Sequence, residues 1–103
     1  MARMIVVWQR PEDTEAFDRH YFGVHVPLAK KLPGLRKYEV SKVPIVALND
    51  AKDPYLVSIL HFDNLASLKA AFASDIGRAC AEDRKALARD ENVQTLLFDV
   101  QEV

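Results

Sequence analysis

Three histidines are the side chains of this sequence best suited to transferring protons near neutral pH: His20, His25 and His61. An imidazole whose pKa lies near ~6.5 can both accept and donate a proton. His25 is the strongest candidate for a catalytic acid or base, because it lies between Gly23 and Pro27, where we expect a helix to bend. The alternative is a packing histidine that bonds to a backbone carbonyl and holds this bend.

Aromatic side chains could form the wall of a pocket beside this histidine. Trp8, Tyr21 and Tyr55 are large enough to line a cavity for an aromatic or lactone-like compound. Tyr21 would offer a phenolic donor if its ring turns inward, and His61 would face the cavity if it shares a strand face with Tyr55. For Trp8 and Tyr55 taken singly, an ordinary core position is the default interpretation, and His61 could equally be solvated at the end of its strand. Together with His25, they predict a site for a small hydrophobic ligand.

Few other motifs with a chemical role occur in the chain. There is no phosphate-binding loop or nucleophile elbow, and the single cysteine, Cys80, excludes an internal disulfide and a clustered cysteine metal site. His20 and His25 are five positions apart, which places them about 140° apart on a regular helix. We therefore expect no shared metal site, no bound cofactor, and an exposed His20.

The segment that carries both of these histidines should be a helix that begins near Thr14. Asp13 and Thr14 can accept hydrogen bonds from the first backbone N–H groups, which have no partner within a helix. Phe17, Tyr21 and Val24 follow at spacings of four and three residues. This spacing predicts an apolar stripe that covers a sheet.

Prolines should bend and then end this helix. Val26 precedes a proline, which disfavours the α conformation at Val26, so we expect the bend between Gly23 and Pro27. Pro33 and Gly34 should stop the helix and turn the chain toward the next strand.

Four segments are typical of strands and lie at residues 4–9, 35–45, 55–62 and 93–100. A polar connection covers residues 47–53, and a second helix, interrupted at Ser74 and Asp75, should start at Asp63 or Asn64. The order β-α-β-β-α-β is the ferredoxin-like pattern, an antiparallel sheet with helices on one face. We expect one α+β domain over residues 1–103.

The first and third strands are apolar on both faces. Tyr55, Val57 and Ile59 should share one face of the third strand, opposite to Leu56 and Leu60. Helices cover only one face of the sheet, and burying one such side chain is worth ~1.5–3 kcal/mol. A second copy of the chain is therefore expected to cover the other face and form a homodimer.

Composition narrows the class of protein. Half of the residues are apolar, 28% are charged, and the net charge is −1, as is ordinary for a globular protein. Nucleic-acid or membrane-surface binding would require a strong positive field, and no apolar run approaches the ~20 residues that cross a bilayer. We expect a cytoplasmic protein with neither kind of partner.

A spaced pattern of residues surrounds the two helical histidines: Phe17, His20-Tyr21, His25, Pro27-Leu28, Leu32-Pro33-Gly34-Leu35 and Tyr38. This pattern resembles that of the EthD family, which is named after a protein linked to ethyl tert-butyl ether degradation. The likeness extends to Arg10-Pro11 and to residues 60–71. The resemblance implies a dimeric α+β barrel, whose relatives include isomerases, cyclases, monooxygenases and haem proteins.

Two functions from different classes follow. The first is a cofactor-free enzyme that isomerises, cyclises or oxygenates a small hydrophobic compound with a carbonyl group, with His25 as acid or base. The second is a non-enzymatic dimeric binding or accessory protein in which the motif residues maintain the fold. Haem binding through an axial His25 is a third possibility.

Overall fold

A computed structural model describes residues 1–49 and 52–103. Its elements are β1 (Ala2–Trp8), α1 (Thr14–His20), a π-helical segment η1 (Tyr21–His25), α2 (Val26–Ala29), β2 (Lys37–Val40), β3 (Leu56–Phe62), α3 (Leu65–Ala73), α4 (Asp75–Leu87), a short 3₁₀ helix η2 (Asp90–Asn92) and β4 (Val93–Asp99). The predicted order is confirmed. Residues 50 and 51 of the predicted 47–53 connection lie outside the described residues.

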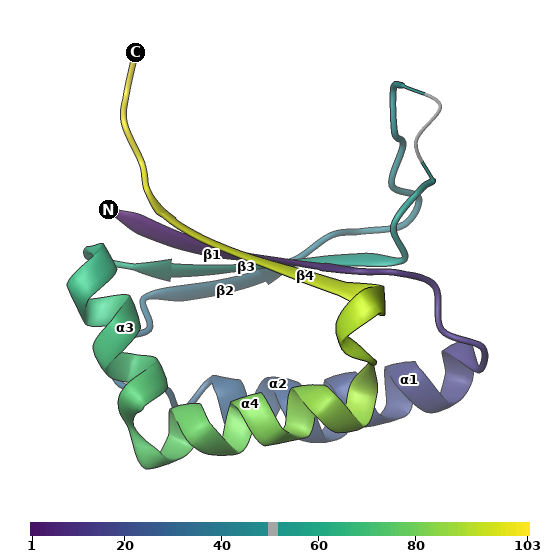
Figure 1. Cartoon of the computed structure of the whole chain (residues 1–103), viewed down its shortest axis with the longest axis horizontal. Helices are drawn as coiled ribbons and strands as arrows, with labels where there is room; N and C mark the ends of the chain where they lie inside the picture. The colour runs from purple at the N-terminus through teal and green to yellow at the C-terminus, as the bar shows by residue number, and fades with distance from the viewer. Residues whose placement is uncertain (50–51) are drawn as a thin grey trace.

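The four strands form one antiparallel sheet in the order β2-β3-β1-β4. Helices α1, α2 and α4 run along one face of this sheet (Figure 1). This arrangement confirms the α+β, ferredoxin-like fold class. The second strand is an edge strand, as expected, but it spans residues 37–40 and not 35–45. The chain leaves the ladder after Ser41, and Pro44 beyond it has no N–H to donate to a sheet.

Side chains of the central strands alternate between two different environments. Val6, Trp8, Leu56 and Leu60 are buried beneath the helices. The register places Ile5 opposite Ile59 and Leu96, on the other face of the sheet. That face, which we call the open face, carries six apolar side chains: Ile5, Val7, Val57, Ile59, Leu96 and Phe98.

Tyr55 does not belong to the open face, contrary to the expectation that it shares a side with Val57. It precedes β3, and its ring lies edge-on against that of Phe17 in α1, with centroids 5.6 Å apart. Its hydroxyl donates to Asp18 at 2.8 Å. The alternation of a strand does not apply to Tyr55 because the residue lies before the strand begins.

The first helix begins where the sequence predicts but does not bend as expected. Asp13 caps α1 by accepting a hydrogen bond from the N–H of Ala16. Val26 keeps α-helical angles, and its N–H donates to the carbonyl of Tyr21, five residues earlier. The predicted bend is thus a π-helical turn. The wider turn accommodates Pro27, which has no N–H and would crowd the preceding turn of a regular α-helix.

The π-helical turn changes which residue faces the sheet. Val24, which the apolar stripe placed inward, is 48% exposed, whereas His25 is 8% exposed. One extra residue in the turn rotates all later positions, so the regular-helix expectation for Val24 is wrong.

The second helical region is divided as predicted. Asn64 caps α3, and Ser74 separates α3 from α4 and accepts a hydrogen bond from the N–H of Gly77. A Cβ at Gly77 would lie 2.3 Å from the carbonyl oxygen of Ala71. Only glycine therefore permits this close approach of α4 to the end of α3.

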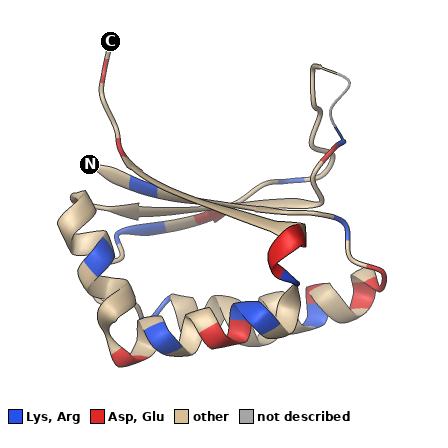
Figure 2. Ribbon diagram, in the orientation of Figure 1, with Lys and Arg blue, Asp and Glu red and all other residues tan. Residues whose placement is uncertain are grey.

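Charged residues of both signs are interspersed along the helices, whereas most of the sheet is uncharged (Figure 2). Among residues 1–49 and 52–103, no helix has the length and apolar character needed to cross a membrane.

Candidate active site

A cavity of about 240 Å³ lies between the sheet and the helices. Its apolar wall includes Met4, Val6, Trp8, Leu60 and Phe72. A cavity of about 150 Å³ holds benzene in an engineered protein, so the present one has room for a single substituted ring. It lies beneath the helices, on the opposite side of the sheet from the open face.

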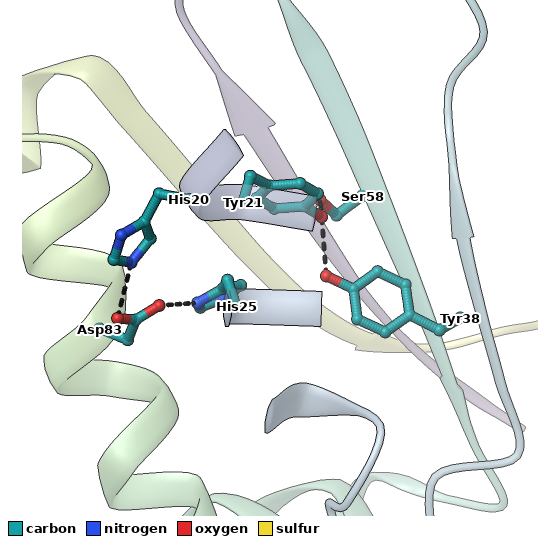
Figure 3. A network of polar contacts seen from close by, with 6 residues as sticks. All are labelled: His20, Tyr21, His25, Tyr38, Ser58 and Asp83. Atoms are coloured by element: carbon teal, nitrogen blue, oxygen red, sulfur yellow. Dashed lines mark hydrogen bonds and ion pairs between the residues drawn. The ribbon is translucent and has the colours of Figure 1, made fainter. Parts of the chain in front are cut away.

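His25 lines this cavity from η1. Its ring packs edge-on against Trp8, with centroids 6.0 Å apart, and stacks on Tyr21 at 5.6 Å. The Nδ1 atom lies 2.9 Å from Oδ2 of Asp83 in α4 (Figure 3). Because the partner is a carboxylate and not a backbone carbonyl, the ring belongs to a histidine–aspartate pair.

Asp83 also contacts His20, the last residue of α1. Its Oδ1 lies 2.8 Å from Nε2 of His20, whose side chain is 37% exposed. His20 and His25 thus lie on one side of the helix, because the π-helical turn brings positions five residues apart into line. The expectation that the two histidines diverge, and that His20 is simply an exposed residue, was wrong.

The surroundings of the pair favour a neutral imidazole beside an ionised carboxylate. Burial lowers the pKa of His25 below its ordinary value, and the hydrogen bond with Asp83 only partly opposes this effect. Burial also acts to raise the pKa of Asp83, but the hydrogen bonds from His25 and His20 together outweigh it and hold that pKa below its ordinary range. Near neutral pH, Asp83 is charged and His25 is not.

These charge states determine the tautomer of His25. A carboxylate only accepts hydrogen bonds, so Nδ1 of His25 carries the hydrogen and Nε2 keeps a lone pair. Nε2 has no hydrogen-bond partner among residues 1–49 and 52–103. Every fully buried side-chain nitrogen or oxygen in these residues does have a partner, so Nε2 is not fully buried. It is therefore accessible and can accept a proton.

A chain of hydroxyl groups lies beside the same cavity. Trp8 donates its indole N–H to Oγ of Ser58 at 3.0 Å. The hydroxyl of Tyr21 lies 2.5 Å from that oxygen and 2.7 Å from the hydroxyl of Tyr38 (Figure 3). Burial raises the pKa of both phenols, so the two hydroxyls keep their hydrogens at neutral pH.

The structure brings together only some of the predicted site residues. His25 and Trp8 line the cavity, and Tyr21 reaches it through hydroxyl contacts with Ser58 and Tyr38. Tyr55 contacts α1 outside the cavity. His61 alternates with the buried residues of β3 and so lies on the open face, where its Nε2 is 2.5 Å from Glu39.

Asp83, Ser58 and Tyr38 were not predicted as site residues. Asp83 shares its helix stripe with Ala79 and Cys80, and an acidic residue at such an inward position is the signal that could have found it. Ser58 is similarly a polar residue on the buried face of an apolar strand. Tyr38 offered no comparable signal, since tyrosine is common in edge strands.

The site geometry does not favour a bound haem. A cavity of about 240 Å³ is too small for a porphyrin, which joins four pyrrole rings, so the residues around His25 do not fit this group. In the described parts of the chain, no cluster of three or more histidine, cysteine, aspartate or glutamate side chains is arranged to hold a metal ion.

Comparison with known proteins identifies the family. The model of the EthD domain matches residues 9–91. The chain belongs to the EthD family. An uncharacterised 11.0 kDa protein of Rhodococcus erythropolis, from the thcB-thcC intergenic region, is 34% identical over 85 residues, which cover 81% of this chain and 80% of that protein. A crystal structure of an EthD family protein from Bacillus halodurans superimposes with a TM-score of 0.86 at 31% identity, covering 98% and 99% of the two chains.

More distant structures share the fold alone. SnoaB, a cofactor-independent oxygenase from Streptomyces nogalater, matches with a TM-score of 0.68 at 14% identity, over 99% of this chain and 94% of that one. A dimeric ferredoxin-like protein of unknown function from Jannaschia matches with a TM-score of 0.68 at 16% identity, over 96% and 98% of the chains.

Proposed function

We propose that this EthD protein is a cofactor-free acid–base catalyst that moves a proton on a small hydrophobic compound. The observation that carries the proposal is the pair of His25 and Asp83: His25 lines an apolar cavity, and its contact with Asp83 through Nδ1 leaves Nε2 unprotonated. The same arrangement, a carboxylate that orients an imidazole, activates general bases in many enzymes.

The proton transfer balances within the pair. Nε2 of His25 takes a proton from an acidic C–H group of the ligand, the C–H bond breaks, and its electrons remain on the ligand. The resulting imidazolium is stabilised by the negative charge of Asp83, 2.9 Å away. Return of the proton to a neighbouring carbon completes an isomerisation, whereas its return to the same carbon only exchanges the hydrogen.

The size and character of the cavity suggest the class of ligand. An apolar wall and a volume of about 240 Å³ suit one aromatic or lactone ring. The fold shared with a cofactor-independent oxygenase supports chemistry without a cofactor. The second candidate, a non-enzymatic binding protein, would use the same cavity but would not need the accessible Nε2.

We also infer that the protein works as a homodimer joined through the open face. Six apolar side chains remain partly exposed there, and no helix of the described chain covers them. The dimeric state of the Jannaschia protein of the same fold supports this inference. The cavity lies on the other side of the sheet, so each copy would keep its own site.

Deuterium exchange tests the enzymatic proposal directly. The probe is phenylacetone, a one-ring ketone whose methylene hydrogens lie between the ring and the carbonyl. NMR in D₂O should show faster replacement of these hydrogens with the wild-type protein than in buffer alone. His25→Gln should lower the protein-catalysed rate by ~10²–10⁴-fold.

His61→Gln is the matched control, because it removes an imidazole that lies on the open face. This variant should exchange phenylacetone at the wild-type rate, provided that sedimentation shows an unchanged assembly. Wild-type exchange no faster than buffer, or equal rates for wild type and His25→Gln, would contradict catalysis by His25. If the wild type shows no exchange activity and His25→Gln loses stability, the results would instead favour the non-enzymatic binding protein.

A further inference from the structure

We propose that Tyr38 donates its phenolic hydrogen to an oxygen atom of the ligand, and that Trp8, Ser58 and Tyr21 orient this donor. The inference deepens the proposed function and rests on the same cavity. It assigns a carbonyl or similar acceptor oxygen to the ligand, and it gives Tyr38 a role in choosing among ligands of equal shape.

Counting hydrogens shows that the hydroxyl chain has one donor to spare. Ser58, Tyr21 and Tyr38 contribute one hydroxyl hydrogen each, and two contacts between their hydroxyl groups have hydrogen-bond geometry, at 2.5 and 2.7 Å. Each contact uses one hydrogen, because an O–H group donates once. One hydrogen therefore remains without an acceptor within the chain of hydroxyls.

The fixed donor at one end sets the direction of the hydroxyl chain. Trp8 can only donate, so the oxygen of Ser58 is an acceptor at 3.0 Å. An oxygen that accepts a hydrogen bond becomes a better donor, which favours Ser58 donating to Tyr21 and Tyr21 donating to Tyr38. The spare hydrogen then belongs to Tyr38, at the end of the chain.

The position of Tyr38 allows it to reach a ligand. Tyr38 lines the cavity together with His25, whereas Tyr21 is fully buried with 0% exposure. A ligand oxygen that accepts from Tyr38 would therefore share the cavity with Nε2 of His25. When His25 takes a proton from the carbon next to a carbonyl, the electrons move to that oxygen, and a phenolic donor stabilises the enolate formed.

Ligand pairs of equal shape separate this hydrogen bond from hydrophobic binding. Phenylacetone and (2-methylprop-2-enyl)benzene differ only by C=O against C=CH₂. We expect wild-type protein to bind the ketone more tightly, and Tyr38→Phe to reduce this preference by roughly 3- to 10-fold, as loss of one hydrogen bond requires. The matched control is Tyr55→Phe, which removes a hydroxyl outside the cavity and should keep the wild-type preference.

A second variant distinguishes Tyr38 from Ser58 as the donor. Ser58→Ala removes the group that sets the direction of the hydroxyl chain but leaves Tyr21 able to donate to Tyr38. It should therefore weaken the preference for the ketone less than Tyr38→Phe does, whereas a donor at Ser58 would be lost and the preference with it. The ¹³C resonance of a labelled carbonyl in bound phenylacetone gives an independent readout, since a hydrogen bond shifts it downfield in wild type and not in Tyr38→Phe. If Tyr38→Phe folds poorly, the carbonyl resonance is compared between wild type and Ser58→Ala. A downfield shift that remains in Ser58→Ala shows that Ser58 is not the donor.

Failure of this inference differs from failure of the proposed function. His25→Gln should lose deuterium exchange but keep the preference for the ketone, because Tyr38 is unchanged. An undiminished preference in Tyr38→Phe, its loss in Ser58→Ala, or no ketone preference in wild type would overturn the role of Tyr38. Ketone preference without deuterium exchange in wild type would support Tyr38 and contradict only the catalysis.

Discussion

Nδ1 of His25 lies 2.9 Å from Oδ2 of Asp83, although 58 positions separate the two residues in the chain. The contact joins η1 to α4 across the helical layer and ties the orientation of the imidazole to the packing of two distant helices. Any change that moves α4 relative to η1 would therefore alter the base without touching it.

Asp83→Asn should lower the rate of phenylacetone exchange by ~10²-fold or more, because an amide neither stabilises an imidazolium nor ensures the correct tautomer. Wild-type activity should fall as the pH drops through the pKa of His25, which burial holds below its ordinary value, since the protonated ring cannot act as a base. Removing the negative charge lowers this pKa further. The acid limb of the pH–rate profile should thus shift to lower pH, and a shift to higher pH would contradict the assigned pair.

Phe17→Ala should destabilise the protein by ~3–5 kcal/mol, because it empties a well-packed aromatic site. Phe17 is 5% exposed, and the centroids of its ring and of the Trp8 ring are 5.5 Å apart. Phe22→Ala is the matched control, since Phe22 is 49% exposed and should lose much less. Denaturant titration gives both free energies of unfolding, and a loss below ~1 kcal/mol for Phe17→Ala would show that its packing contributes little.

Val57→Asp should convert the proposed dimer to monomer at micromolar concentration, because an unpaired charge in a dry interface is strongly unfavourable. Sedimentation velocity measures the change. Val24→Asp places the same charge on the exposed side of the helical layer and should leave the assembly intact. A Val57→Asp protein that sediments like wild type would show that the open face is not the interface.

Short-range patterns in the sequence determined the elements and their order. Asp13, Asn64 and Ser74 cap helices at the places that the sequence predicted, where Asp13 or Thr14 and Asp63 or Asn64 were the candidates, because a capping side chain acts on N–H groups only two or three residues away. The two faces of β1 and β3 likewise follow from alternation along each strand, which also predicted that Val57 and Ile59 share the face that the helices do not cover.

The tertiary structure alone decided which side chains meet at the cavity. The π-helical turn at Tyr21–His25 inserts one residue into the helical period, so it exchanges the inward positions of Val24 and His25, and a regular 3.6-residue spacing cannot anticipate this. The contacts of His25 with Asp83, and of Tyr21 with Ser58 and Tyr38, join separate elements. They depend on how the helices and the sheet pack, and local periodicity carries no information about such distances.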